Sequence, residues 1–333
     1  MFNETLKSKF RDFTIHCFSD IYKNENSLFL TFLIMYVNIL LGNIMVFTCI
    51  ILDSHLHTPM YIFLGNLAVI DICSTSNILP KLMYMLSSQQ KNMTFQECMT
   101  QMYFFIYFTC TEFLLLAVMA YDRYVAICHP LHYSLLLNLK QCALFLVGIW
   151  TSAALEPVIH CIFIANLSFC SSHQINHFFC DISPLLKLSC SDTLHIEIAT
   201  YVLGAIVGLS AFTLTLSSYV FIIYTIVNIR SADGRRKAFF TCASHLASVL
   251  IFYGTSLSLH VRPMSAYSPM QDKLFSLLYI ILIPIANPFI YTLKNKQFKE
   301  SFKKVVKDGY NNAAARCRRN LPTDILKCGI KGK

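Results

Sequence analysis

Seven nearly continuous apolar runs divide this chain of 333 residues. Each run has about 20 residues or more, which lets it cross the hydrocarbon core of a bilayer as one helix with internal backbone hydrogen bonds. Only 14% of the residues are charged, whereas soluble domains carry about 25%. We therefore predict an all-α membrane protein, a seven-transmembrane helix bundle with spans at Leu28–Leu52, Thr58–Leu86, Phe95–Ile127, Cys142–Ala165, Ile196–Ile229, Ala238–Val261 and Leu274–Leu293.

Basic residues set the orientation of this bundle. With the N-terminus outside, the cytoplasmic segments hold 18 of the 27 Lys and Arg residues, as the positive-inside rule requires. The net charge of +9 then belongs to a membrane-facing tail, and we expect no nucleic-acid partner. We expect no cleavable signal peptide, so that the first span itself directs insertion. The predicted order is an extracellular segment (1–27), a transmembrane domain (28–293), an amphipathic interfacial helix (294–306) and a basic cytoplasmic tail (307–333).

The interfacial helix is predicted from its pattern of apolar residues. Phe298, Phe302, Val305 and Val306 fall on one helical face, and lysines surround the rest of the segment. A helix of this kind lies on the inner leaflet with its apolar face buried among the lipids.

The cysteines on the outer side predict disulfide bonds. Five of the 14 cysteines fall there, namely Cys17, Cys98, Cys170, Cys180 and Cys190. In an oxidising compartment, the four cysteines near the bundle suggest two disulfides, and the residues alone leave three pairings open. A bond from Cys98 to the long outer loop ties that loop over the helices, and Cys17 is then the odd cysteine. The alternative, which the oxidising outside disfavours, is a metal site formed by Cys170, His173, His177 and Cys180.

Three N-glycosylation sequons also fall on the proposed outer side. They begin at Asn3, Asn92 and Asn166. Asn3 is the most accessible, whereas the other two lie close to span ends, where access for the modifying enzyme is restricted. The sequence therefore predicts a glycoprotein modified at Asn3, and leaves Asn92 and Asn166 open.

Polar side chains interrupt the apolar spans. A carboxylate in hydrocarbon is costly, so it faces the bundle interior and has partners there. For Asp71 and Glu112 two interpretations stay open: polar contacts between helices with one acid protonated, or a hydrated cation site. Glu156, which precedes Pro157 in the fourth span, is an acid that instead could line a cavity. The predicted intramembrane polar network comprises Asn43, Asp71, Glu112 and Asn287.

The stretch MAYDRYVAICHPLHY, from Met119 to Tyr133, ends the third span with an acid and an arginine side by side. An arginine is always charged and carries five N–H donors, so at a membrane boundary it needs a partner. Movement of the Arg123 guanidinium between Asp122 and another acceptor makes a two-state element that binding elsewhere can bias. A lone arginine at a span end would only extend toward the headgroups.

These residues resemble the vertebrate olfactory receptors of the tetrapod-type class, which are rhodopsin-like G-protein-coupled receptors. The resemblance covers about Leu28 to Val306, and several of its motifs are specific to that family. The matching stretches are Gly42-Asn43, LHTPMYIFLGNLAVID (Leu56–Asp71), MAYDRYVAICHPLHY (Met119–Tyr133), HFFCDISPLLKLSCSDT (His177–Thr193), SSYVFII (Ser217–Ile223), KAFFTCASHL (Lys237–Leu246) and NPFIYTLKNK (Asn287–Lys296).

The resemblance implies an odorant receptor in the plasma membrane of olfactory sensory neuron cilia. It implies activation of a heterotrimeric, stimulatory olfactory-type G protein that raises cyclic AMP, with no enzyme activity, metal or cofactor. By matched motif, Asp122 holds Arg123 in the resting state, and activation frees Arg123 to face the G protein and Tyr219. The implied switch and coupling residues are Asp122, Arg123, Tyr124, Tyr219, His245 and Tyr291, and the implied disulfides are Cys98–Cys180 and Cys170–Cys190.

The resemblance also implies a ligand pocket in the outer half of the bundle. It is largely apolar, with a few hydrogen-bonding groups, which suits a small, volatile, mostly apolar molecule held by burial. Phe105 stands where amine-sensing receptors carry an aspartate, so a simple amine is not expected as agonist. The implied lining consists of Phe105, Ile106, Thr109, Cys110, Leu203, Gly204, Val207, Tyr253, Ser256, Leu257, His260 and Ile280.

Two other functional classes fit the sequence less well. A transporter or channel is disfavoured because no inverted repeat is evident and one acidic pair is little for a coupled ion path. A ligand-gated conductance without a G-protein response would favour that class. A membrane enzyme is disfavoured because the chain shows no His- or Cys-based catalytic cluster facing a pocket.

Overall fold

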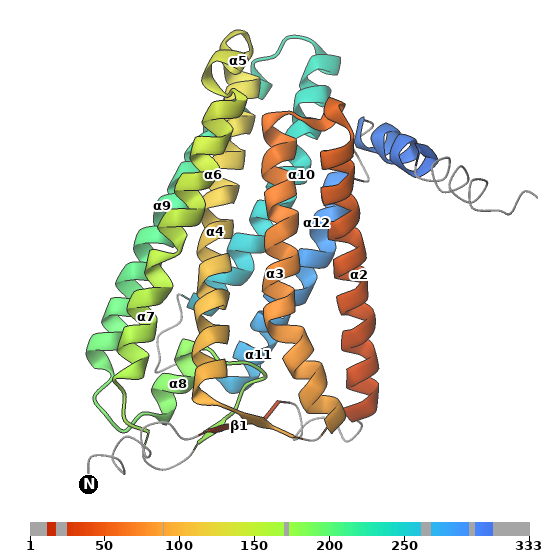
Figure 1. Cartoon of the computed structure of the whole chain (residues 1–333). Coiled ribbons are helices and arrows are strands. Elements are labelled where there is room, and N and C mark those ends of the chain that lie inside the picture. The colour runs from red at the N-terminus through yellow and green to blue at the C-terminus, as the bar shows by residue number, and fades with distance from the viewer. Residues whose placement is uncertain are drawn as a thin grey trace, which may run out of the picture.

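The computed structural model of the chain describes residues 12–17, 25–88, 90–169, 173–260, 268–292 and 297–308. Seven helical spans run side by side through it (Figure 1), which confirms the predicted bundle. Five spans are single helices: α2 (Glu25–Leu52), α3 (Pro59–Ser88), α4 (Phe95–Cys128), α9 (Leu194–Val227) and α10 (Ala232–His260). The other two are composite: α6 (Leu139–Ala153) with α7 (Leu155–Ala165), and α11 (Pro269–Leu277) with a π-helical turn (Leu278–Leu282) and α12 (Ile283–Thr292).

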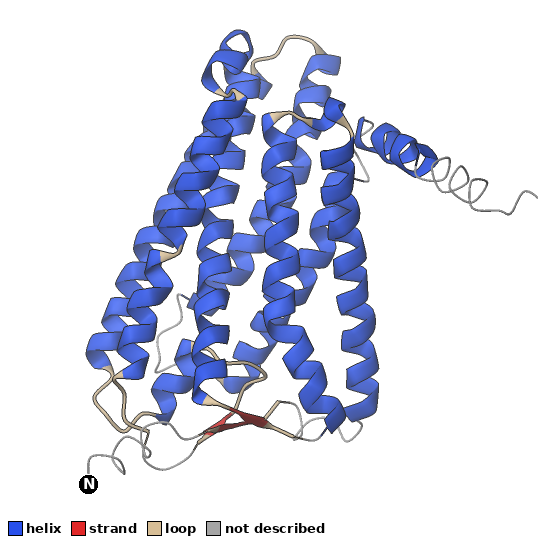
Figure 2. Cartoon of the chain, in the orientation of Figure 1, coloured by secondary structure: helices blue, strands red, loops and turns tan. Residues whose placement is uncertain are grey.

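Short elements connect the spans (Figure 2). On the cytoplasmic side these are two 3₁₀ turns (Ser54–Leu56 and Pro130–His132) and α5 (Tyr133–Leu136). On the outer side they are α8 (Ile182–Leu188) and the strands β1 (Phe13–Ile15), β2 (Asn92–Met93) and β3 (Gln174–Ile175). Residues 297–308, within and beyond the predicted interfacial helix, are helical and follow the seventh span.

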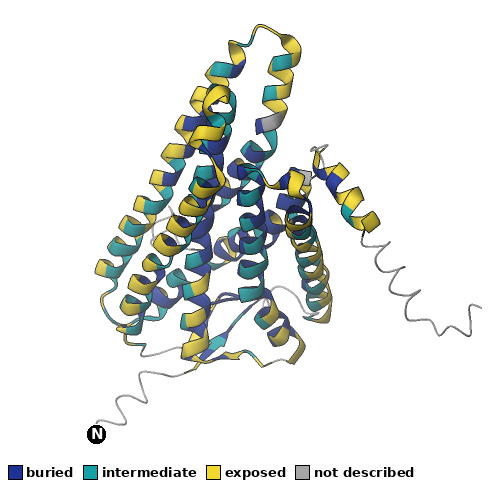
Figure 3. Cartoon of the chain, turned by 45° about the horizontal axis from the view of Figure 1, so that its top comes forward, coloured by how far each residue is buried: buried dark blue, intermediate teal, exposed yellow. Residues whose placement is uncertain are grey.

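The outward faces of the spans are apolar, as a lipid solvent requires. Leu41, Leu144 and Ile206 are among the large apolar side chains exposed there. Exposed residues follow the outer faces of the helices, whereas buried residues gather between them (Figure 3). Polar groups inside the bundle therefore have to find partners on neighbouring helices, because hydrocarbon offers none.

Helix α4 is the centre of the bundle. It packs against α3, α6, α7, α9 and α10. A capping box fixes its first residue: the Glu97 amide donates to Thr94 Oγ1 at 3.2 Å, and the Thr94 amide donates to Glu97 Oε2 at 2.9 Å. Because the start of the helix is fixed in this way, so is the face that each later residue presents.

Two interruptions shape the spans around α4. The fourth span breaks at Ala154, three residues before Pro157, whose ring nitrogen has no hydrogen to donate to the preceding turn. The seventh span contains the π-helical turn, an insertion that rotates the residues on either side of it relative to a regular helix. Both interruptions lie beside the interior of the bundle and decide which side chains face it.

A small three-stranded sheet lies at the outer end of the bundle, the lower end in Figure 1. Strand β1 pairs antiparallel with β2, where Phe13 faces Met93, and parallel with β3, where Thr14 faces Gln174. The disulfide between Cys98 and Cys180 joins the start of α4 to the same outer loop, with an S–S distance of 2.06 Å. Three segments far apart in the sequence are thereby combined into one outer lid, which hydropathy does not predict.

Lys273, at the outer end of the seventh span, fastens this lid. Its side chain is buried, and its ammonium donates to the carbonyls of His16 and Cys17 and, at 2.7 Å, to Asn176 Oδ1. An ammonium has three N–H donors, so three acceptors satisfy it. Cys17 carries a free thiol buried beneath the lid, and burial raises the pKa of this thiol to about 12.

The cytoplasmic end has a corresponding contact around Asp53. This carboxylate lies 3.0 Å from His55 Nδ1 and accepts from Lys304 Nζ at 3.1 Å, which ties helix 297–308 to the first cytoplasmic turn. These hydrogen bonds, chiefly the one from His55, hold the pKa of Asp53 well below its ordinary value. Phe298 is fully buried on the same helix.

We predict that Lys273→Ala loosens the lid, because two carbonyls and an amide oxygen lose their shared donor. Cys17 should then react faster with a membrane-impermeant thiol reagent on intact cells, by about tenfold or more if the lost contacts are worth more than 1.4 kcal/mol. The control is Lys273→Ala combined with Cys17→Ser, which should show no added labelling. Equal labelling of Cys17 in the wild type and in Lys273→Ala would contradict this role.

Candidate functional site

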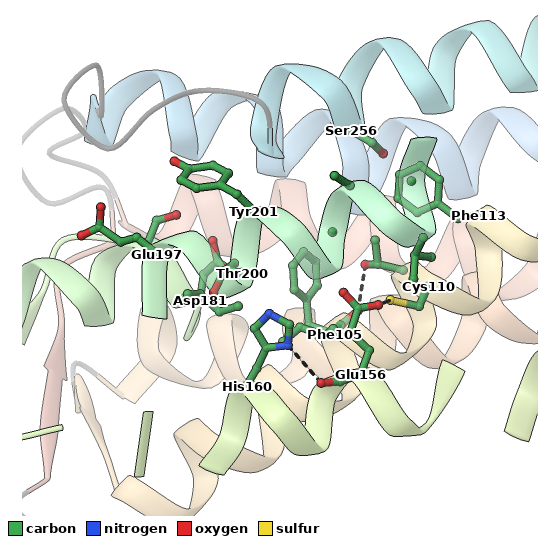
Figure 4. A pocket seen from close by; sticks show the side chains of 18 of the residues that line it. Phe105, Cys110, Phe113, Glu156, His160, Asp181, Glu197, Thr200, Tyr201 and Ser256 are labelled. Carbon is green, nitrogen blue, oxygen red and sulfur yellow. Dashed lines mark hydrogen bonds between the residues drawn. The ribbon is translucent and has the colours of Figure 1, made fainter. Parts of the chain in front are cut away.

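A cavity of about 370 Å³ lies in the outer half of the bundle. Its wall on α4 runs from Phe105 to Phe113, which is the outer part of a helix that begins at Phe95 and ends at Cys128. The other walls come from α7, α8, α9, α10 and α11 (Figure 4). Because Asp181 and Ile182 of the outer loop also line it, the lid is part of its outer wall.

Aromatic packing supports the inner wall of the cavity. The ring of Phe105 lies 4.9 Å from that of Phe179 in the outer loop and 5.9 Å from that of Tyr279. The ring of Phe113 lies 4.7 Å from that of Phe252. These edge-on and tilted contacts are the favourable geometries for aromatic pairs, so the rings form a rigid boundary.

The floor of the cavity leads into the polar interior of the bundle. The hydroxyl of Tyr279 lies 3.2 Å from Thr109 Oγ1, which lines the cavity, and 3.0 Å from Glu112 Oε2, which lies below it. The π-helical turn contains Tyr279 and brings its side chain toward α4. One tyrosine therefore connects the cavity to the buried acid Glu112.

The polar interior continues between α3 and α12. Asn287 Nδ2 donates to Asp71 Oδ2 at 3.0 Å, and Ser248 Oγ donates to Asn287 Oδ1 at 3.2 Å. Asn43 Nδ2 donates to the carbonyl of Pro284 at 3.0 Å. The structure thus places the four predicted network residues in two neighbouring groups: Asn43, Asp71 and Asn287 around α12, and Glu112 against Tyr279.

At the cytoplasmic end, Asp122 holds Arg123. Arg123 Nε and Nη2 both donate to Asp122 Oδ2, at 2.9 and 2.5 Å, and Asp122 is fully buried. The Tyr133 hydroxyl donates to the second oxygen, Asp122 Oδ1, at 2.7 Å. Burial raises the pKa of Tyr133, so the hydroxyl keeps the proton that it donates.

Known proteins identify this arrangement. The sequence profile of the olfactory receptor family matches residues 32–308. The chain belongs to the olfactory receptor family. Relatives include olfactory receptor 1F1 of Homo sapiens, 43% identical, with 91% of this chain and 97% of that receptor covered. Olfactory receptor 5G3 of Homo sapiens is 46% identical, with 84% and 89% covered, and olfactory receptor 1G1 of Gorilla gorilla gorilla is 42% identical, with 89% and 94% covered.

Membership of this family has direct consequences. The chain is an odorant receptor of the G-protein-coupled class, a multi-pass plasma membrane protein and not an enzyme. The family resemblance expected from the motifs is confirmed.

The structure places seven of the twelve expected pocket residues on the wall of the cavity: Phe105, Ile106, Thr109, Cys110, Gly204, Val207 and Ser256. Leu203, Tyr253 and Ile280 are not on this wall. Leu203 is one position from Gly204, and successive residues of a helix point about 100° apart. The side chains of Leu257 and His260 lie outside the described residues.

The two excluded interior residues have other partners. The hydroxyl of Tyr253 lies 3.3 Å from Thr215 Oγ1, and its ring packs against Phe113. Ile280 is buried within the π-helical turn, where the adjacent Tyr279 takes the position facing α4. Periodicity alone predicts neither outcome, because a π-helical turn shifts the helix phase that the prediction assumes.

Of the other residues predicted for the switch, Tyr219 and His245 contact each other. The Tyr219 hydroxyl lies 2.7 Å from His245 Nδ1, with the two rings stacked, and the Tyr124 hydroxyl lies 3.0 Å from His129 Nε2. Tyr291 is buried in the core. Arg123 Nε and Nη2 both donate to Asp122, so the structure shows the arrangement in which the acid holds the arginine.

Sequence reasoning missed several residues at these sites. Tyr133 was not assigned to the switch, although it ends the stretch that begins at Met119. Tyr279 carried no signal of its own in an apolar run. Several polar residues of the cavity wall were likewise not assigned to the pocket, among them His160, Asp181, Glu197 and Asp272.

The structure describes only some of the predicted outer disulfide cysteines and glycosylation sites. Cys180 bonds to Cys98, so it is not a ligand in the alternative metal site. Cys190 is disulfide-bonded, and Cys170 lies outside the described residues. Asn92 in β2 and Asn166 after α7 are exposed, whereas Asn3 lies outside the described residues. Glycosylation at Asn3 stays a prediction, and the use of Asn92 and Asn166 stays open.

We predict that Gly204→Leu lowers agonist potency by about tenfold or more, because a leucine there fills space that the ligand occupies, and 1.4 kcal/mol corresponds to a tenfold change. A Cβ at Gly204 meets no atom within 4 Å, so the substitution should not disturb the fold. Gly148→Leu is the matched control, because a Cβ there also meets no atom within 4 Å and Gly148 is not on the cavity wall. Dose–response curves for cyclic AMP measure the effect, and equal potency in both variants would show that the ligand binds elsewhere.

Proposed function

We propose that this receptor binds a small, volatile, mostly apolar odorant in the outer cavity and activates a stimulatory, olfactory-type G protein. The G protein then raises cyclic AMP in the cilia of olfactory sensory neurons. The size of the cavity, about 370 Å³, supports a small ligand, since small-molecule sites begin at about 300 Å³. Phe105, Ile106 and Phe113 supply an apolar surface on which such a molecule is buried.

The observation that carries this proposal is the buried contact between Asp122 and Arg123. Arg123 is held in a site where water is scarce, and Tyr133 occupies the other oxygen of the same carboxylate. A charge pair that loses one partner in such a site is strongly destabilised. The guanidinium therefore leaves Asp122 only when another acceptor is offered, and the C-terminal helix of a G protein would offer backbone carbonyls there.

The connection between the two ends runs through α4 and the seventh span. Thr109 and Glu112 contact Tyr279 near the cavity. Asn287, in the next segment of the seventh span, contacts Asp71. These helices would have a resting and an active arrangement, and a ligand packed against Thr109 would bind the two with different affinities. The ligand shifts the equilibrium toward the arrangement that it binds more tightly. In the active arrangement, α10 moves outward and opens the cytoplasmic end.

We predict that Arg123→Ala abolishes the cyclic AMP response to an active odorant while the receptor still reaches the cell surface. The physical reason is that alanine removes the guanidinium group, whose N–H donors would bind the G protein. Lys140→Ala serves as the control, because Lys140 is an exposed cytoplasmic charge outside this contact. Cells expressing each variant are exposed to a broad panel of volatile molecules, and both cyclic AMP and surface receptor are measured.

Full signalling by Arg123→Ala at normal surface expression would contradict the assigned switch. An odorant-gated conductance in the purified protein, with no cyclic AMP response in cells, would contradict coupling to a G protein and favour a channel.

A further inference from the structure

The charged side chains on the described wall of the cavity are all acids. They are Glu156, Asp181, Glu197 and Asp272, and the described wall holds neither a lysine nor an arginine. Three of these acids have side-chain contacts: Glu197 Oε1 accepts from Thr193 Oγ1 at 2.7 Å, Asp272 lies 4.0 Å from His177, and one oxygen of Glu156 accepts from Cys110. The second oxygen of Glu156 and the carboxylate of Asp181 are the acceptors considered for a ligand (Figure 4).

Glu156 presents a carboxylate oxygen to the cavity. It lies in the first turn of α7, just after the break at Ala154. Its Oε2 accepts from the Cys110 thiol at 2.6 Å, whereas its Oε1 has no hydrogen-bond donor among the described residues. A thiol is a weak donor, so it does not neutralise the acid. The start of a helix favours negative charge, and this carboxylate lies in the first turn of α7.

His160 lies one turn further along α7 and adds a second acceptor. Its side chain is 2% exposed, and its Nδ1 lies 3.0 Å from the backbone carbonyl oxygen of Glu156. A carbonyl can only accept, so Nδ1 carries the proton and, in the neutral ring, Nε2 is a bare acceptor. Nε2 has no partner among the described residues, and Figure 4 shows it on the side of the ring that faces the cavity.

Asp181 adds negative potential at the outer wall. It precedes α8 but makes no side-chain cap with that helix. Burial raises its pKa to about 6. At neutral pH, above that value, most of this carboxylate is still ionised. A ligand that enters from the lid side therefore meets a field that favours positive charge.

We propose that this receptor selects a small hydrophobic amine, bound as its ammonium ion, which donates N–H groups to Glu156 Oε1 and His160 Nε2 while its hydrocarbon part packs on Phe105 and Phe113. An ammonium has three donors and no acceptor, so it complements two acceptors that otherwise stay unpaired. Aromatic faces add cation–π attraction. This inference rests on the proposed odorant-receptor function and names the ligand class of the same cavity.

A simple amine is not expected from the sequence, because Phe105 stands where amine-sensing receptors carry an aspartate. Phe105 indeed places no acid at that point of α4, but Glu156, just after the break in the fourth span, lies on the neighbouring wall beside Cys110 of α4. The proposed amine would therefore find its counter-charge on α7. Ligands of the other polar classes fit less well: a carboxylic acid is repelled by the acids, and a ketone or ester has no hydrogen to donate to either acceptor.

The test compares ligands that share a hydrocarbon skeleton and differ in one group. Linear hexyl, cyclohexylmethyl and benzyl skeletons are each applied as the primary amine, the alcohol and the carboxylic acid, next to a broad odorant panel. Cells expressing the full receptor report cyclic AMP, and untransfected cells correct for direct effects of the amines. We expect the amine to be the most potent member of an active skeleton and the acid to be the least potent.

Glu156→Gln identifies the counter-charge. It keeps the shape of the side chain and removes its charge, so the potency of the amine should fall about tenfold or more, and that of the matched alcohol by less than about threefold. Asp192→Asn is the matched control, because it removes an exposed acid on the outer face away from the cavity. His160→Phe removes the second acceptor at similar size and should also lower amine potency more than alcohol potency.

The outcomes separate the two proposals. An amine preference that Glu156→Gln removes and Asp192→Asn retains supports the inference. Activation by alcohols or acids at lower concentrations than by amines overturns the inference and leaves the receptor function standing. The wild-type ranking gives this answer even if a variant fails to reach the cell surface. A receptor at the surface that responds to no member of the skeleton series or the odorant panel overturns the proposed function as well.

Discussion

Hydrocarbon cannot hydrate a polar atom, and the interior of this receptor is organised around that constraint. Asp122 holds Arg123, Asn287 donates to Asp71, and the Tyr279 hydroxyl lies against Glu112. Each contact joins polar groups that would be unfavourable in hydrocarbon without a partner. Each group can therefore leave its partner only when another polar group replaces it. At the cavity wall, Glu156 Oε1 and His160 Nε2 are acceptors that an incoming molecule can satisfy.

Helix α4 makes one unit of these contacts. Its capping box at Thr94 fixes the helix start, the disulfide at Cys98 ties that end to the lid, and its last turns carry Asp122 and Arg123. Between the two ends, Thr109 faces the cavity and Glu112 faces the polar interior. With the proposed ligand site at one end of this helix and the proposed switch at the other, a small rotation or shift of α4 would act on both. Packed interiors convert displacements of this kind into discrete states.

Sequence predicted the parts of this architecture that depend on composition and local pattern. Apolar runs gave the seven spans, the basic residues gave the orientation, and the stretch around Asp122 gave the family. It suggested that Glu156 lines a cavity, and the structure places Glu156 on the cavity wall. It could not predict which face each span turns inward where a helix is irregular: His160 also lies on that wall after the break at Ala154, and in the π-helical turn Tyr279, rather than Ile280, faces α4. The lid could not be predicted from the sequence either, because strands of two or three residues from distant segments have no detectable periodicity.

The lid affects how fast a bound molecule leaves the cavity. Asp272 lies on the cavity wall, and the next residue, Lys273, fastens β1 and the outer loop across the mouth of the bundle. A molecule that leaves through the lid has to separate those three contacts in addition to its own contacts in the cavity. An ammonium group that never touches the odorant therefore slows release by this route and lengthens the response.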